Sequence, residues 1–235
     1  MKTKIFLIAV LSVSAIAFAA CQTAPTTNTA NTNAQRANTA VAGSNSNSMM
    51  NMNGNSMNAN HDMSAMHHSS DVKSDPNAAS QPYDLQFIDT MTAHHQGAID
   101  MAQMALKNSQ NDELKKFAQK IIDDQRKEIA QLKDWRDKWY AGKPAAKNME
   151  MPGMADSMKM MMGDGMKKME AAKGKEFDLM FLDMMTPHHA GATAMAKEAL
   201  QKAERPEIKT LAQTIIREQE MEIKQMADWK ASWSK

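Results

Sequence analysis

The sequence of 235 residues has only one cysteine, Cys21, so no disulfide bond can form within the chain and no cysteine-based zinc site is available. It also lacks a hydrolase-type arrangement of nucleophile and base, a phosphate-binding glycine-rich loop and a nucleic-acid-binding motif. Strong charge of one sign is absent as well. Without the two lysines of residues 1–20, which are described below as a predicted leader, the chain has 26 basic and 27 acidic residues. This balance gives no field that would recruit nucleic acid.

Residues 1–20 have the pattern of an export signal, with two lysines near the start, an apolar run over Ile5–Ala19 and small residues before Cys21. The apolar run is too short for a transmembrane helix. Its end resembles a bacterial lipobox, which predicts lipid attachment at Cys21 and anchoring to a membrane. Phe18 departs from the usual leucine, and cleavage by ordinary signal peptidase remains the alternative. Either way, we expect the protein in the periplasm or cell envelope.

Residues 21–80 are rich in asparagine, threonine, alanine and serine and almost lack large aliphatic side chains, which predicts a disordered tether. Within it lies a tract of soft donors that has no packing role to play. Thioethers favour Cu(I) or Ag(I), and neutral imidazole adds affinity for Cu(II), so we expect this tract to bind metal. The alternative is that these residues accumulated by sequence drift in a low-complexity segment and bind nothing. The predicted ligands of this tract are His61, Met63, Met66, His67 and His68.

A second methionine-rich segment spans residues 141–172 and is interrupted by prolines and glycines, which predicts a polar linker with helix at most toward its end. Its methionines are weaker indicators of a metal site, because methionines at helical spacing usually fill a core or an adaptable surface.

The rest of the chain is a repeat. Residues 83–139 recur without a gap at an offset of 94 residues, so that His94 matches His188 and Trp139 matches Trp233, and about half of the positions are identical. Apolar residues spaced three and four apart predict a helical hairpin over 81–140 and another over 173–235. Each hairpin has one apolar face to bury. The sequence therefore predicts an all-α fold, a four-helix bundle with internal pseudo-two-fold symmetry.

Each repeat contains a pair of adjacent histidines in its first helix. Adjacent residues on a helix point about 100° apart, so the two imidazoles of a pair cannot face one point. One methionine stands four residues before the second histidine of each pair, and another stands two turns beyond the first. At these places a methionine can bind the same metal ion as the histidine. The predicted metal ligands of the bundle are His94, His95, Met91 and Met101, and in the second repeat His188, His189, Met185 and Met195.

Polar residues interrupt the apolar face of the second helix in each repeat, as Gln125 and Glu128 and as Gln219 and Glu222. A polar residue on a buried face needs a partner, and the histidines of the facing helix are the nearest candidates. Two interpretations remain open. The contact could simply determine the register of the bundle, or the carboxylate could orient a metal-binding imidazole.

These residues form a recognisable pattern, Phe-x-x-x-Met-x-x-His-His-x-x-Ala-x-x-Met-Ala followed by Gln-x-x-Glu-Ile, over residues 83–140 and 177–234. The pattern resembles the bacterial family called domain of unknown function 305 (DUF305). The resemblance implies a ferritin-like four-helical fold, an exported location and, for some members, copper binding and copper resistance. It implies no settled activity for the family as a whole.

We therefore expect an exported protein that binds copper, with Cu(I) favoured and Cu(II) second, and that sequesters or buffers it in the envelope without being an enzyme. Its expected partners are the metal ion and, through Cys21, a membrane. Its oligomeric state is left open. One rival is a metal-free structural or interaction module. A ferritin-like metal oxidase is less favoured, because the chain has no Glu-x-x-His pair of the kind that di-iron bundles use.

Overall fold

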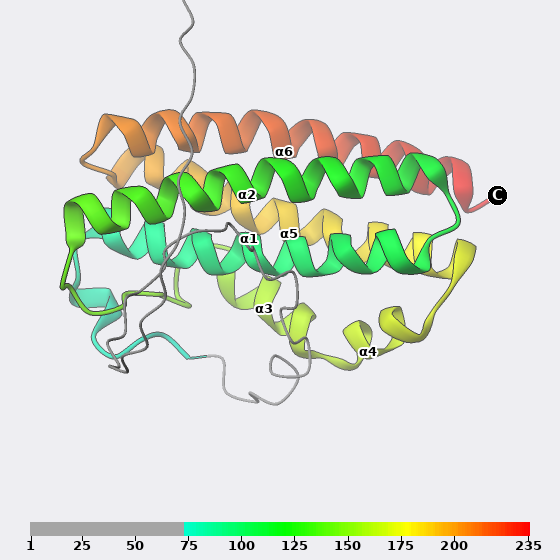
Figure 1. The fold of residues 1–235 in the computed structure, drawn as a ribbon, viewed down its shortest axis with the longest axis horizontal. Helices are drawn as coiled ribbons and strands as arrows, with labels where there is room; N and C mark the ends of the chain where they lie inside the picture. Colours follow the sequence, from blue (N-terminus) through cyan, green and yellow to red (C-terminus); the bar gives the residue numbers. More distant parts are fainter. Residues whose placement is uncertain (1–72) are drawn as a thin grey trace, which may run out of the picture. The chain divides into compact units, whose positions relative to one another are not determined.

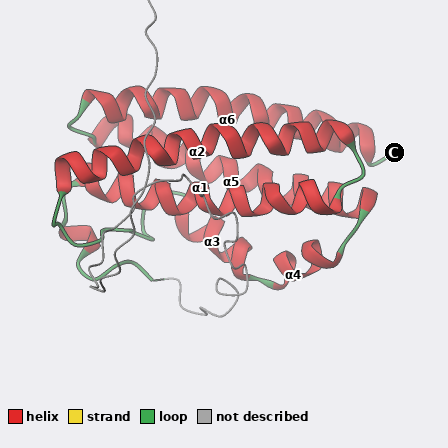
Figure 2. Cartoon of the chain, viewed as in Figure 1, coloured by secondary structure: helices red, strands yellow, loops and turns green. Residues whose placement is uncertain are grey.

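The computed structural model describes residues 73–235, and within that range the chain is helical and contains no β-strand (Figures 1 and 2). The predicted leader, Cys21 and the tract from His61 to His68 lie outside the described residues. The elements are the short 3₁₀ helix η2 (Ala78–Ser80) and the helices α1 (Tyr83–Asn108), α2 (Asp112–Tyr140), α3 (Met154–Met162), α4 (Asp164–Ala171), α5 (Gly174–Lys202) and α6 (Pro206–Trp233).

The two predicted hairpins are confirmed as α1–α2 and α5–α6, the pairs of helices in most extensive contact. Local sequence explains where the second helix of each hairpin begins. The side chain of Asn111 accepts hydrogen bonds from the backbone N–H groups of Glu113 and Leu114 and so caps α2. Pro206 occupies the first turn of α6, where its missing N–H costs nothing.

The long helices form two layers, and α3 and α4 add a third (Figure 1). Helices α1 and α5 contact each other in the middle layer. Helices α2 and α6 lie on one side of this pair, where Phe117 and Trp229 meet edge to face at 5.1 Å between ring centroids. Helices α3 and α4 pack against the opposite side. The α1–α5 pair is thereby covered on both faces, and its side chains are the most deeply buried of the fold.

The segment between the hairpins differs from the polar linker that the sequence predicted. It contains α3 and α4, separated by Gly163, and five of its methionines are buried against the hairpins: Met149, Met151, Met154, Met166 and Met169. The physical reason is that unbranched methionines follow helical spacing on one face of each short helix, so that the segment has an apolar side despite its polar composition. The four-helix bundle thus carries two additional helices.

The end of the predicted tether also belongs to the folded part. The backbone N–H of Asp75 donates to the carbonyl of Lys147, and the Lys147 N–H donates to the Asp75 carboxylate at 2.7 Å. Ala78 of η2 is buried. No helix within residues 73–235 is long and apolar enough to cross a membrane.

Two clusters of buried apolar side chains fill the interior, one toward each end of α1 and α5. The first joins residues 98–105 of α1 to residues 177–185 of α5, and the second joins residues 87–91 of α1 to residues 192–199 of α5. The adjacent histidines lie between the two clusters, at the middle of the helix pair. The symmetry of the repeat therefore brings all four imidazoles to the centre of the fold.

Candidate metal centre

His94, His95, His188 and His189, the histidine quartet, are each at most 1% exposed. His94 and His188 meet across the α1–α5 interface, with ring centroids 3.9 Å apart and ring planes inclined at 42°. Within each pair the centroids lie 6.3 Å apart in the first repeat and 6.5 Å in the second. The first histidine of each pair thus faces the other repeat. The second, about 100° around its helix, faces the second helix of its own hairpin.

Helix α3 determines the tautomer of His94. The Oγ of Ser157 lies 3.0 Å from the His94 Nε2 and donates its only proton to the carbonyl of Gly153, at 2.7 Å. Because that proton is already committed, the His94 Nε2 must be the donor in the contact with Ser157. The Nδ1 of His94 is then left as a bare lone pair, and it has no hydrogen-bond partner among the described residues.

His188 has neither of its ring nitrogens satisfied. The Nδ1 and Nε2 are buried and have no hydrogen-bond partner within residues 73–235. A Cβ added to Gly97 would lie 3.3 Å from the His188 Nε2, and one added to Gly191 would lie 3.2 Å from the His94 Nε2. The two glycines stand three residues after the first histidine of their own repeats. Gly97 thus leaves room for the imidazole of His188, and Gly191 leaves room for that of His94.

The outer histidines contact glutamates as the sequence predicted. The His95 Nε2 lies 2.8 Å from the Glu128 carboxylate of α2, and the His189 Nε2 lies 2.8 Å from the Glu222 carboxylate of α6. The His189 Nε2–H donates to Glu222, which leaves Nδ1 as the remaining nitrogen of that ring. The His95 Nε2 is equally close to Glu128 but lacks the geometry of a hydrogen bond. Neither Nδ1 has a partner in the described part of the chain. These contacts are the arrangement in which a carboxylate orients an imidazole that binds a metal.

The glutamines of the same faces do not follow the prediction. The buried Oε1 atoms of Gln125 and Gln219 have no partner, and no hydrogen bond joins either glutamine to a histidine in the described residues.

Burial, and then the neighbouring histidines, hold the pKa of His94 and of His188 well below the usual value of about 6.5. Both imidazoles are therefore neutral at physiological pH. Neutral imidazole is the form that binds metals, since a protonated ring has no lone pair to offer.

Within residues 73–235, six buried imidazole nitrogens of the quartet have no hydrogen-bond partner, and among these the His95 Nε2 lies close to a carboxylate. Such a set is unusual, because buried polar atoms in native proteins nearly always have a partner. Their donor type suits a soft or borderline metal ion. Within residues 73–235 no group of three or more His, Cys, Asp or Glu side chains is spaced to bind a metal ion by itself. A site built here would therefore use few imidazoles, complemented by donors of another kind.

The predicted methionine ligands are all buried, but in the apolar clusters. Met91 and Met195 lie in the second cluster, and Met101 and Met185 lie in the first. The symmetry of the repeat thus places one methionine from each hairpin on either side of the histidine quartet. Their packing role is evident from the structure, and their role as ligands stays a prediction.

Two residues of α3 beside the quartet were not predicted as part of the site: Ser157, which contacts His94, and Met161, which lies with the His188 Nε2 over the backbone of Gly97. Both belong to the methionine-rich segment, whose packing the composition did not show. A signal was present in the repeat itself, because Gly97 and Gly191 occur at equal places after the histidines. A conserved spacing of histidine and glycine within one chain indicates a position where another group approaches the backbone closely.

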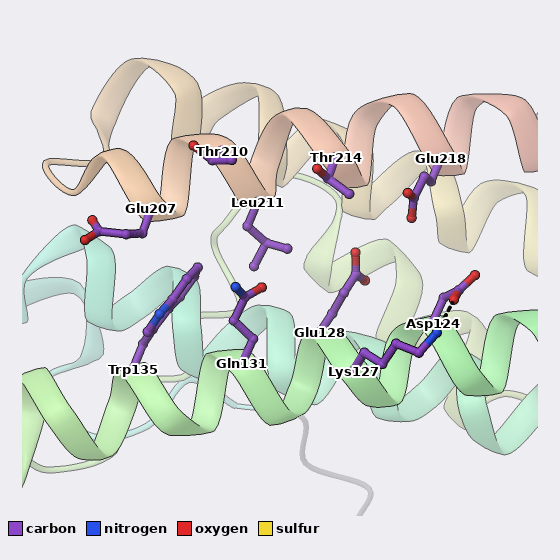
Figure 3. A pocket seen from close by; sticks show the side chains of 10 residues that line it. All are labelled: Asp124, Lys127, Glu128, Gln131, Trp135, Glu207, Thr210, Leu211, Thr214 and Glu218. Atoms are coloured by element: carbon purple, nitrogen blue, oxygen red, sulfur yellow. Dashed lines mark hydrogen bonds and ion pairs between the residues drawn. The ribbon is translucent and has the colours of Figure 1, made fainter. Parts of the chain in front are cut away.

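A groove of about 690 Å³ lies between α2 and α6 (Figure 3). Glu128, which contacts His95, lines the groove and points into the space between the two helices (Figure 3). Asp124, Glu207 and Glu218 also line it, against one lysine, Lys127. The groove is therefore predominantly acidic where the Glu128 carboxylate meets it.

The two glutamates are not equivalent. Lys120 of α2 lies 2.8 Å from the Glu222 carboxylate, whereas Thr214 stands at the corresponding place beside Glu128. Burial raises the pKa of Glu222, but the hydrogen bonds and charges of His189 and Lys120 outweigh burial and lower it. The second repeat thus has a carboxylate with two partners from two helices, and the first has one.

We expect Glu222→Gln to lower the free energy of unfolding by about 1–3 kcal/mol at pH 7, because it weakens a buried charged hydrogen bond and leaves Lys120 without that partner. The contribution is complete above the unfolded pKa of about 4.3 and disappears as the pH falls through the lower folded pKa. Urea denaturation of the full chain at pH 7 and pH 3.5 measures both effects. Glu128→Gln is the matched control and should cost less. Equal losses for the two variants would contradict the asymmetry.

Comparison with known proteins gives one consistent result. The sequence profile of the family described as "Domain of unknown function (DUF305)" matches residues 20–136 and 84–230. A DUF305 protein from Streptomyces coelicolor is 29% identical, with a TM-score of 0.59, over 68% of this chain and 95% of that one. CopM in the Cu(II)-bound form is 42% identical, with a TM-score of 0.54, over 64% of this chain and 97% of that one.

CopM in the Cu(I)-bound form is 39% identical, with a TM-score of 0.52. The solved relatives therefore align over almost their whole length, and this chain extends beyond them. The curated proteins compared with the chain gave no match. Since the family profile covers most of the sequence and the solved relatives share its fold, the chain belongs to the DUF305 family.

Proposed function

We propose that this protein binds copper in the cell envelope and sequesters it, with the histidine quartet as the metal centre of the folded part. The observation behind the proposal is the set of six buried imidazole nitrogens of the quartet that have no hydrogen-bond partner within the described residues. Leaving such atoms unpaired costs free energy, and a bound metal ion would recover it.

The relatives support the choice of metal. CopM, 39–42% identical to this chain, has been solved with Cu(I), with Cu(II) and with Ag bound. Cu(I) and Ag(I) are soft ions that thioether and imidazole ligands favour, and Cu(II) accepts imidazole readily. The chain contains 25 methionines and 7 histidines, which supply both kinds of donor.

Each part of the site has a separate task in this proposal. His94 and His188 offer neutral lone pairs toward the repeat interface. Ser157 holds His94 in the tautomer with a bare Nδ1. The glutamates of α2 and α6 orient the outer imidazoles and make them more basic. The apolar clusters on either side exclude water. The lower dielectric constant there strengthens the attraction between a metal ion and donor atoms that are already in position.

The location and the accessory sites come from the sequence. The leader and Cys21 support export followed by attachment of a lipid, which would keep the protein at a membrane of the envelope. One solved relative, the Streptomyces coelicolor protein, is described as a candidate secreted protein. His61, Met63, Met66, His67 and His68 would add weaker sites that exchange metal faster than a buried centre. Such a set of sites suits storage and transfer of the ion rather than turnover.

Titration of the full chain with Cu(I) and with Cu(II), each against a competing chelator, tests this proposal. We expect the double variant His94→Gln, His188→Gln to lose at least about tenfold in copper affinity, the lower end of what disruption of a metal site costs. The matched control replaces the three tract histidines by glutamine and Met63 and Met66 by leucine. It should lose only weaker binding. A double variant that binds both ions as tightly as the wild type would refute the histidine quartet as the copper site.

A further inference from the structure

The two hairpins are repeats of each other, but α3 occurs once, and it makes the two sides of the histidine quartet different. Ser157 and Met161 are one helical turn apart on α3 and so share a face of it. Ser157 contacts His94 of the first repeat. Met161 lies toward His188 of the second. The Ser157 hydroxyl is therefore hydrogen-bonded to the His94 imidazole, whereas the group of α3 on the His188 side is the Met161 thioether.

Gly97 shows how closely Met161 and His188 converge. A Cβ at Gly97 would lie 3.3 Å from the His188 Nε2, 3.3 Å from the Met161 Cε and 3.6 Å from the Met161 Sδ. The sulfur and the unpartnered nitrogen thus border one small volume above the backbone of α1. Only glycine leaves that volume free of a side chain.

The burial of the two residues differs in a useful way. His188 is 1% exposed, whereas Met161 is only partly buried and packs against the first apolar cluster. A more exposed thioether thus lies near a buried imidazole whose ring nitrogens have no hydrogen-bond partner in the described part of the chain. A groove of about 680 Å³ opens between α3 and α5 and is lined by Met160, the residue before Met161, and by Met184. Two methionines therefore line a groove on the α3 side of the fold, and the neighbouring Met161 lies over Gly97 together with the His188 Nε2.

We propose that Met161 is a thioether ligand that completes a soft-metal site with His188, and that α3 is the side from which a soft monovalent ion reaches the histidine quartet. This inference rests on the proposed function, since it assigns a ligand and a direction of access to the same centre. It also assigns selectivity. A thioether beside a neutral imidazole favours Cu(I) and Ag(I), whereas Cu(II) accepts imidazole without needing sulfur.

Binding at this site needs no redox step and no loss of a proton. A thioether does not titrate, and the unpartnered lone pair of a neutral imidazole is available at once. Ag(I) is therefore a suitable probe, because it is soft, monovalent and redox-inert under the conditions of a titration.

The test uses the full chain labelled with ¹³C at the methionine methyl groups and titrated with Ag(I). Met161→Leu, a swap that conserves volume, identifies the Met161 resonance by its disappearance. We expect that resonance to shift with the first equivalent of Ag(I) in the wild type and to stay in place in His188→Gln. Met158→Leu, on the same helix but against the second apolar cluster, is the matched control. It should leave the shift of the Met161 resonance unchanged.

Chelator competition gives the second readout. Met161→Leu should weaken Cu(I) binding by about tenfold and leave Cu(II) affinity unchanged, and Met158→Leu should change neither. A Met161 resonance that does not move, together with unchanged Cu(I) affinity, overturns the inference while binding that depends on His94 and His188 still supports the proposed function. Loss of that histidine dependence would instead overturn the proposed function itself.

Discussion

Replacing Gly153 with alanine is expected to lower the free energy of unfolding by about 3 kcal/mol or more and to weaken Cu(I) binding in the same variant. Gly153 caps α3 with φ at 78°, a left-handed conformation that costs an L-residue about 1–2 kcal/mol. Its Cβ would also lie 2.3 Å from the Cα of Gly191, a backbone atom of α5 that cannot turn aside. Overlap of that kind adds about 1–3 kcal/mol.

The expected loss of metal binding follows from the same contact. Moving the start of α3 away from α5 would carry Ser157 and Met161 away from His94 and His188. Urea denaturation and Cu(I) competition on the full chain measure the two effects. Gly142→Ala is the matched control, because Gly142 also has a positive φ, 73°, but nothing lies within 4 Å of its added Cβ. It should cost only about 1 kcal/mol and leave affinity unchanged. Equal costs for both alanines would show that α3 is not held by this glycine contact.

Replacing His188 with leucine is expected to raise the stability of the metal-free protein by about 1–3 kcal/mol while abolishing its stabilisation by copper. Both ring nitrogens of His188 are buried without a partner within the described residues, and burying an unpaired polar group costs about that much. Leucine removes the polar atoms at similar volume and leaves no other group unpaired. In the wild type, an ion at about 1,000 times its Kd adds roughly 4 kcal/mol, which the variant would lose.

The dependence of stability on pH supplies an independent check of the same variant. The lowered pKa of His94 and of His188 means that the unfolded chain takes up protons first, below about pH 6.5. Each histidine then reduces stability by up to about 1.4 kcal/mol per pH unit as the pH falls toward the folded pKa. His188→Leu should show a shallower decline, because one of these groups is gone. Melting curves between pH 5 and pH 8, with and without Cu(I), give both results.

A purely structural histidine would behave in the opposite way. If His188 stabilised the bundle through contacts of its ring, His188→Leu would lower the melting temperature and leave metal binding intact. That outcome would favour the metal-free module over the copper centre. The Glu–His contacts of the outer histidines do not distinguish the two cases, because they serve equally to hold the register of a hairpin and to orient a ligand.

The predictions from the sequence succeeded where one helix or one hairpin was enough to decide. The spacing of apolar residues predicted α1, α2, α5 and α6. A contact of Glu128 with one of the two histidines of the facing helix was also expected, because these residues lie on the facing sides of one hairpin. In each case the interacting residues are related by helical geometry alone.

The predictions were incomplete where two segments distant in the sequence meet. The methionine-rich segment was expected to be a polar linker, yet Met154 and Met166 are buried. A short helix with few apolar residues becomes stable only when a matching surface is present, and composition does not contain that surface. For the same reason neither Ser157 nor Met161 was recognised as a neighbour of the histidines.

By itself, the amino-acid sequence determined that this protein has two equivalent helical hairpins, that each contains a pair of histidines, and that the chain holds soft donors in excess. These features follow from periodicity and side-chain chemistry, which are local. Only the tertiary structure decided that His94 faces His188, that the outer histidines turn to Glu128 and Glu222, and that α3 places a serine on one side and a methionine on the other. The physical reason is that burial and loss of hydrogen-bond partners are properties of packing between segments, which no single segment specifies.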